Sequence, residues 1–90
     1  MSNLKLILSQ KNILRHLIFV ESFDHIQTET GYDFGTIRDD LIQLINHGFV
    51  EVYDLESETS VSPFYDSDNI DQFSFKATKT GLKKIQRYAV

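Results

Sequence analysis

The chain has 90 residues, of which 41% are hydrophobic and 24% are charged, and its formal net charge at pH 7 is −4. This length fits one domain, and the ordinary composition excludes a disordered or a fibrous protein. An acidic chain has no general attraction for nucleic acid or anionic lipid, so any contact with DNA must depend on a local group of cations.

The first expected helix lies in the segment SQKNILRHLIFVES. Ile13, Leu14, Leu17 and Ile18, with Phe19 and Val20 as further candidates, have the spacing of a helix with a broad buried face. Ser9 is a candidate N-cap for this helix. The preceding LKLIL, residues 4–8, is either a strand or an extension of the helix, because periodicity cannot decide over so short a segment.

The segment SFDHIQTETG predicts a second, short helix of about two turns. Ser22 can cap its N-terminus, and Phe23 and Ile26 are expected to point inward. Gly31 can adopt the left-handed conformation that ends a helix.

A third helix is expected from Phe34 to His47, with Asp33 as its N-cap. Gly48 is placed to end it. Its apolar face consists of residues spaced i, i+4, i+7 and i+8: Ile37, Leu41, Leu44 and Ile45. This regular spacing makes it the clearest element in the sequence.

Two strands are expected to follow, because FVEVY (Phe49 to Tyr53) and FSFKA (residues 73–77) are rich in β-forming residues. They are predicted to pair antiparallel. Between them we expect a long loop, Asp54 to Asp71, of 18 residues that are rich in acidic residues and serine.

The last segment, TKTGLKKIQRYAV, predicts a closing helix capped by Thr80. Leu82 and Ile85 are expected to point inward. Lys83, Lys84 and Arg87 are then expected to point outward.

Two of these segments, TETGYDFGTIRDDLIQLINHGFVEV and FKATKTGLKKI, resemble parts of the winged helix-turn-helix transcription regulators. In that superfamily a glycine-containing turn precedes a recognition helix with Leu-x-x-Leu, then Gly, an apolar residue and the first wing strand. The second wing strand passes through Thr-x-x-Gly into the closing helix. The resemblance implies an α+β, helix-dominant winged helix with a three-helix core, a two-stranded antiparallel wing with a long loop, and a C-terminal helix. It implies one domain over residues 1–90, with a recognisable core at about 12–86.

The resemblance further implies a small transcription-regulator-like protein that binds duplex DNA through the helix at residues 34–47. In such regulators the recognition helix lies in the major groove and the wing contacts the backbone. Carried over by position, the base-reading candidates are Phe34, Thr36, Arg38, Asp39 and Gln43. The candidates for phosphate contacts are Lys11, Arg15, Lys76 and Lys79.

The distribution of charge favours a different function. Between Arg38 and Lys76 the sequence contains no cation, and its wing segment is acidic. Because DNA affinity depends heavily on phosphate neutralisation by Lys and Arg, such a wing opposes binding. The alternative is a winged-helix protein-interaction or dimerisation module that uses its acidic wing and does not bind DNA directly, with Phe64 and Tyr65 as aromatic contacts. A homodimer could form if the basic terminal segments meet the acidic wing of a second copy.

Other chemistry finds little support in the sequence. Zero cysteines exclude disulfides, thiolate zinc sites and a cysteine nucleophile. His16, His25 and His47 come from different expected helices and match no metal-ligand pattern. With no phosphate-binding glycine loop and no nucleophile motif, we expect no enzyme and no cofactor. No stretch resembles a secretion signal or a membrane span, so we expect a cytoplasmic protein without a membrane partner.

Overall fold

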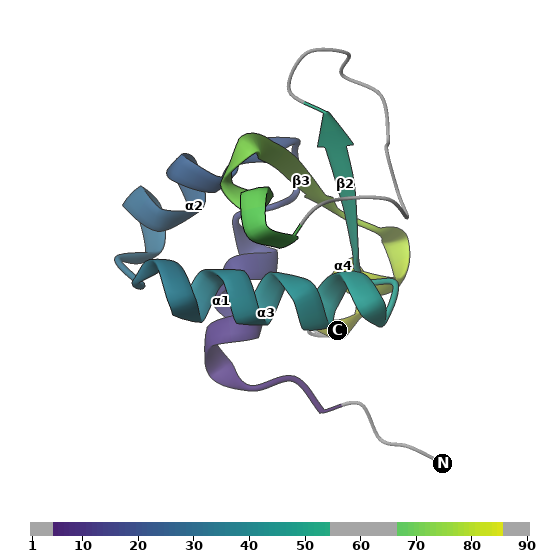
Figure 1. Ribbon diagram of the computed structural model, residues 1–90. Coiled ribbons are helices and arrows are strands. Elements are labelled where there is room, and N and C mark those ends of the chain that lie inside the picture. The colour runs from purple at the N-terminus through teal and green to yellow at the C-terminus, as the bar shows by residue number, and fades with distance from the viewer. Residues whose placement is uncertain (1–4, 55–66, 86–90) are drawn as a thin grey trace.

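The fold combines four α-helices with a three-stranded antiparallel sheet in the residues that the structure, a computed structural model, describes: 5–54 and 67–85 (Figure 1). The elements in chain order are α1 (Leu8–Arg15), β1 (Glu21–Ser22), α2 (Phe23–Thr30), α3 (Phe34–Asn46), β2 (Val50–Asp54), the 3₁₀ helix η1 (Ser67–Gln72), β3 (Phe73–Ala77) and α4 (Lys79–Ile85). The expected α+β class, dominated by helix, is confirmed.

The caps of α2 and α3 lie where the sequence predicts them. Ser22 Oγ accepts a hydrogen bond from His25 N at 3.1 Å, and Asp33 Oδ1 accepts one from Thr36 N at 2.9 Å. Gly31 ends α2 with φ at 74°, a conformation that costs other residues more than glycine. Each cap satisfies backbone groups that the helix itself leaves without partners.

The Asp33 cap predicts a dependence of stability on pH. The pKa of Asp33 lies below its ordinary value of 3.8 because the side chain and then the backbone N–H of Thr36 donate hydrogen bonds to the carboxylate. A lowered pKa in the folded state means that the carboxylate stabilises the fold above about pH 4, and that this contribution is lost as the pH falls through the folded-state pKa.

We therefore expect Asp33→Asn, which keeps a capping side chain, to lose less stability than the parent chain on acidification. The measurement is urea unfolding of both proteins from neutral pH to about pH 3, below the ordinary pKa of an aspartate. Parallel stability curves over that range would contradict this assignment of the cap.

Two predicted N-caps are wrong. The Ser9 hydroxyl caps no helix but donates to Asp40 Oδ2 at 2.6 Å, and α1 begins at Leu8, where Gln10 Oε1 accepts from Ile7 N at 3.2 Å. In α4 the cap is Thr78 instead of Thr80, since Thr78 Oγ1 accepts from Gly81 N at 3.0 Å. A cap must lie two or three residues before the N–H that it binds, and both helices begin earlier than the apolar pattern suggests.

Thr78 also fastens α4 to the turn between α3 and β2. Its hydroxyl donates to Gly48 O at 2.7 Å, and its backbone N–H donates to Phe49 O at 3.0 Å. Gly81 then lies against the Phe49 backbone, in a space that a β-carbon would overfill. In this chain, the Thr-x-x-Gly pattern, Thr78 to Gly81, thus allows the beginning of α4 to pack closely against the backbone just before β2.

The sheet has the order β1-β3-β2, so the expectation of a two-stranded sheet is incomplete. Glu21 and Ser22 form the additional strand, opposite Phe75 and Ser74 of β3. Two residues are too few to show the alternation by which a strand is recognised in sequence. β2 pairs with β3 from Val50 opposite Ala77 to Asp54 opposite Phe73, and so begins one residue later than predicted.

The segment expected to be a loop from Asp54 to Asp71 contains η1 in its second half. Ile70 of η1 is fully buried and packs into the core against α2 and α3. The core also contains residues from all four α-helices or their flanking turns, and from β2 and β3. Phe64 and Tyr65, the predicted aromatic contacts of this loop, lie outside the described residues.

Candidate interaction surfaces

The five residues predicted to read DNA bases all belong to α3, and the structure places Phe34, Arg38, Asp39 and Gln43 on its exposed side. Phe34 remains 40% exposed, but its ring packs against that of Phe23 with centroids 5.0 Å apart. Thr36 is partly buried. This side of α3 is therefore accessible, although Phe34 already has a packing role.

The polar groups of α3 are largely engaged with the protein itself. Both Nε and Nη2 of Arg38 donate to Asp39 Oδ1, at 3.2 and 3.1 Å. Gln43 Oε1 accepts from Gln10 Nε2 at 3.0 Å, and Asp40 accepts from Ser9 as described above. The last two bonds join α3 to α1, which crosses behind it (Figure 1). A base contact by Arg38 or Gln43 would therefore be limited to the donors that these bonds leave, Nη1 of Arg38 and Nε2 of Gln43.

The charges are segregated between elements. The helices α1 and α4 pack against each other and contain no carboxylate. Their cations are Lys11, Arg15, Lys79, Lys83 and Lys84. By contrast, residues 21–54 contain eight carboxylates and a single Lys or Arg, Arg38. Three of the predicted phosphate-contacting residues therefore lie on the basic pair of helices, while the fourth, Lys76, lies on β3 opposite Glu51.

Large apolar side chains are exposed at both ends of α1. Ile7 lies just before α1, and Leu8 is its first residue. After the helix come Ile18, Phe19 and Val20. Phe19 is 73% exposed. Leu17, in contrast, is buried, and its carbonyl oxygen accepts from Ala77 N at 2.8 Å. With Leu17 fixed to β3 on one side and β1 paired to β3 on the other, the three intervening side chains project from the sheet.

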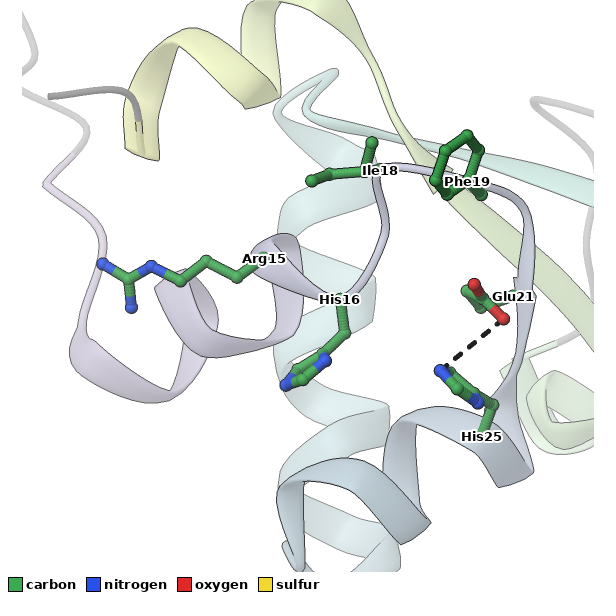
Figure 2. A pocket seen from close by; sticks show the side chains of 6 residues that line it. All are labelled: Arg15, His16, Ile18, Phe19, Glu21 and His25. Carbon is green, nitrogen blue, oxygen red and sulfur yellow. Dashed lines mark ion pairs between the residues drawn. The ribbon is translucent and has the colours of Figure 1, made fainter.

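A shallow pocket of about 210 Å³ lies between α1 and α2, beside this projecting segment (Figure 2). Its lining residues are Arg15, His16, Ile18, Phe19, Glu21 and His25. Glu21 Oε1 lies 3.6 Å from His25 Nε2 and pairs with it when the imidazole is protonated. Figure 2 shows this pair on one side of the pocket, whereas the Arg15 side chain runs away from it along α1, where its Nη1 donates to Asn12 Oδ1 at 2.8 Å.

This pocket was not predicted from the sequence, because the expectation that Ile18, Phe19 and Val20 lie on the buried face of the first helix is wrong: α1 ends at Arg15, and all three side chains are exposed. The available signal was the run of consecutive apolar residues Ile18, Phe19 and Val20 at the end of the first helical pattern. Three consecutive side chains span too wide an arc to face one core from a helix. The run therefore indicated either a strand or exposed apolar surface.

Other classes of site find no support in the parts of the chain that the structure covers. Over residues 5–54 and 67–85, no three His, Cys, Asp or Glu side chains are grouped so that they could hold a metal ion. Within the same ranges, no helix has the length and apolar character that crossing a bilayer requires. Comparisons with protein-family models, with curated proteins and with solved structures find no match.

Proposed function

We propose that this chain is a winged-helix protein-interaction module that binds a protein partner and does not read DNA through α3. The element order and the antiparallel pairing of β2 with β3 are compatible with a winged-helix arrangement. The observation that carries the functional choice is that Arg38, the single Lys or Arg of residues 21–54, is held by Asp39. A recognition helix whose single Lys or Arg is paired with an adjacent carboxylate carries no net positive charge there, and phosphate neutralisation by cations is the main source of DNA affinity.

The base-reading hypothesis would require compensation elsewhere. Arg38 would still have its Nη1 donors for a guanine, the base with which arginine makes its commonest specific contact, but Asp39 would approach the DNA beside it. A carboxylate so close to the phosphates opposes binding, because like charges repel. The cations of α1 and α4 lie on other helices than the base-reading candidates and would have to reach the phosphates from there.

The first test is selection from a labelled pool of random DNA duplexes by the full chain, at about 50 mM and about 200 mM salt, a range over which phosphate-dependent binding falls steeply. We expect no enriched sequence at either salt concentration. We also expect Arg38→Glu to leave any residual binding unchanged, with Lys83→Glu as the matched charge reversal on α4. Enrichment of a sequence that Arg38→Glu abolishes would overturn the proposal.

The positive arm of the test uses photocrosslinking in cells with benzoylphenylalanine in place of Asn46 on exposed α3 or Phe19 beyond α1. The proposal predicts a protein adduct of discrete mass from at least one of the two positions. It also predicts no nucleic-acid adduct from position 46. A nucleic-acid adduct there, together with an enriched duplex, would restore the regulator hypothesis.

A further inference from the structure

We infer that the partner presents an acidic segment with an apolar anchor side chain, and that this segment binds along the α1 stripe. The α1 stripe is defined as Leu8, Lys11, Arg15, Ile18 and Phe19. The inference rests on the proposed function and specifies the surface and the chemistry of the partner.

The α1 stripe lies along the outer side of α1 and the segment that follows it. Leu8, Lys11 and Arg15 are spaced i, i+3 and i+7, which places them on one face of the helix. The opposite face carries Ile13 and Leu14, which are fully buried. Leu8, at 70% exposed, and Phe19, at 73%, therefore mark the two apolar ends of a stripe with cations between them.

The pocket at the Phe19 end of the α1 stripe suits an anchor side chain. Ile18 and Phe19 provide its apolar wall, and the imidazoles of His16 and His25 add donors at its margin (Figure 2). An apolar side chain entering the pocket would cover the exposed surface of Ile18 and Phe19, and such anchors supply most of the affinity in protein interfaces. The carboxylate in the pocket, Glu21, is already directed toward His25.

The charges beside the α1 stripe select an acidic segment. Lys11 and Arg15 lie within it, and exposed Lys79 and Lys83 lie on α4, which packs against α1. Because neither helix has a carboxylate, the cations of this surface are not neutralised by acids of their own helices. Carboxylates on a partner would meet a surface of the complementary sign, which accelerates association and selects the binding register.

Other occupants fit these observations less well. In a symmetric dimer the basic helices of each copy would meet the acidic residues of the other, but among the described residues the exposed large apolar side chains mostly flank α1 instead of those acidic residues, so a second copy offers few anchors. A flat bilayer would have to accommodate the cations at the same level as Leu8 and Phe19, because they lie between these residues. Nucleic acid could use the cations, but would leave the apolar ends of the stripe in water.

The test is selection of displayed random short peptides by the immobilised full chain. We expect enriched peptides to combine several Asp or Glu residues with at least one Phe, Leu or Trp. A synthetic, fluorescent copy of the most enriched peptide should then bind with an affinity that falls as salt is raised, because its carboxylates are screened. Enrichment of peptides without acidic residues, or no enrichment at all, would overturn the inference.

Matched variants then locate the peptide. Phe19→Ser and Arg15→Glu are each expected to weaken its binding at least about tenfold, the loss typical of a strong interface contact. Arg38→Glu, the same charge reversal on α3, and Val20→Ser, at a neighbouring exposed position, should each change binding less than about twofold, as contacts outside the interface centre do. Phe19→Leu should restore most of the affinity lost in Phe19→Ser. Thermal unfolding verifies that every variant is folded.

Two further measurements distinguish the remaining occupants. Binding of the chain to phosphatidylcholine and phosphatidylserine vesicles, lost in Phe19→Ser, would overturn the inference in favour of a lipid surface. Self-association in sedimentation, lost in Arg15→Glu, would overturn it in favour of a second copy. Peptide binding that none of the stripe variants affects would overturn the assignment of the α1 stripe as the binding surface, but not the proposal that the chain is an interaction module. That proposal fails separately, if a selected DNA sequence binds in a manner that depends on Arg38.

Discussion

Replacing Ile70 by alanine is expected to destabilise the fold by about 2–5 kcal/mol, the usual cost of truncating a buried isoleucine. Ile70 is fully buried although it belongs to a short 3₁₀ helix in a segment whose sequence is acidic and polar. Its side chain packs where η1 meets α2 and α3. Alanine would leave a cavity there that the surrounding helices can fill only in part.

The measurement for Ile70→Ala is the free energy of unfolding from urea denaturation. A matched control is Ile18→Ala, because Ile18 is the same residue type but is 52% exposed, and we expect a change below about 0.5 kcal/mol there. Small domains have total stabilities of about 5–15 kcal/mol, so Ile70→Ala removes a large share. Equal effects of the two substitutions would show that η1 does not anchor the segment before β3.

Replacing Gly81 by alanine is expected to cost about 1–3 kcal/mol or more, through overpacking of a close contact. A β-carbon at Gly81 would overlap the carbonyl oxygen of Phe49, and it would lie 3.0 Å from the carbonyl carbon and 3.1 Å from Cα of the same residue. Since these are backbone atoms, no side-chain rotation can relieve the clash. Helix α4 would have to move away from the beginning of β2, which weakens the Thr78 bonds as well.

Gly35→Ala is the matched control for Gly81→Ala. Gly35 lies in the first turn of α3, and a β-carbon there meets nothing within 4 Å. Alanine at that position is expected to leave stability unchanged or to raise it by up to about 1 kcal/mol, because glycine loses more conformational entropy in a helix. Thermal unfolding of both variants checks the prediction, and a Gly81→Ala protein as stable as the parent would contradict the packing argument.

The elements that sequence reasoning predicted well are those determined by local chemistry. Ser22 and Asp33 cap helices, and Gly31 ends one, through groups three or four residues away, so their roles can be inferred without knowing the fold. β1 and the burial of Ile70 depend on contacts with distant segments, β3 and the helices α2 and α3. No local pattern contains that information.

The candidate surfaces, too, could be predicted only where local sequence determines them. The family resemblance made Arg38 and Gln43 base-reading candidates, and both are exposed on α3, but it gave no sign that Asp39 and Gln10 bind them. The Gln10–Gln43 bond joins two helices far apart in the sequence, and its existence follows only from their packing. The basic surface was foreseen as cations near the two ends of the chain, and the packing of α1 on α4 brings those elements together.

The hydrogen bond between Leu17 O and Ala77 N means that the surface at Phe19 forms late during synthesis of the chain. Leu17 emerges from the ribosome well before its partner on β3, Ala77, which follows it by 60 residues. Contacts so distant in sequence form late, because a long loop must close first. Until β3 is in place, the segment carrying Ile18 and Phe19 lacks both of its attachments to the sheet. A partner that recognises this segment in its folded geometry would thereby discriminate finished molecules from nascent ones.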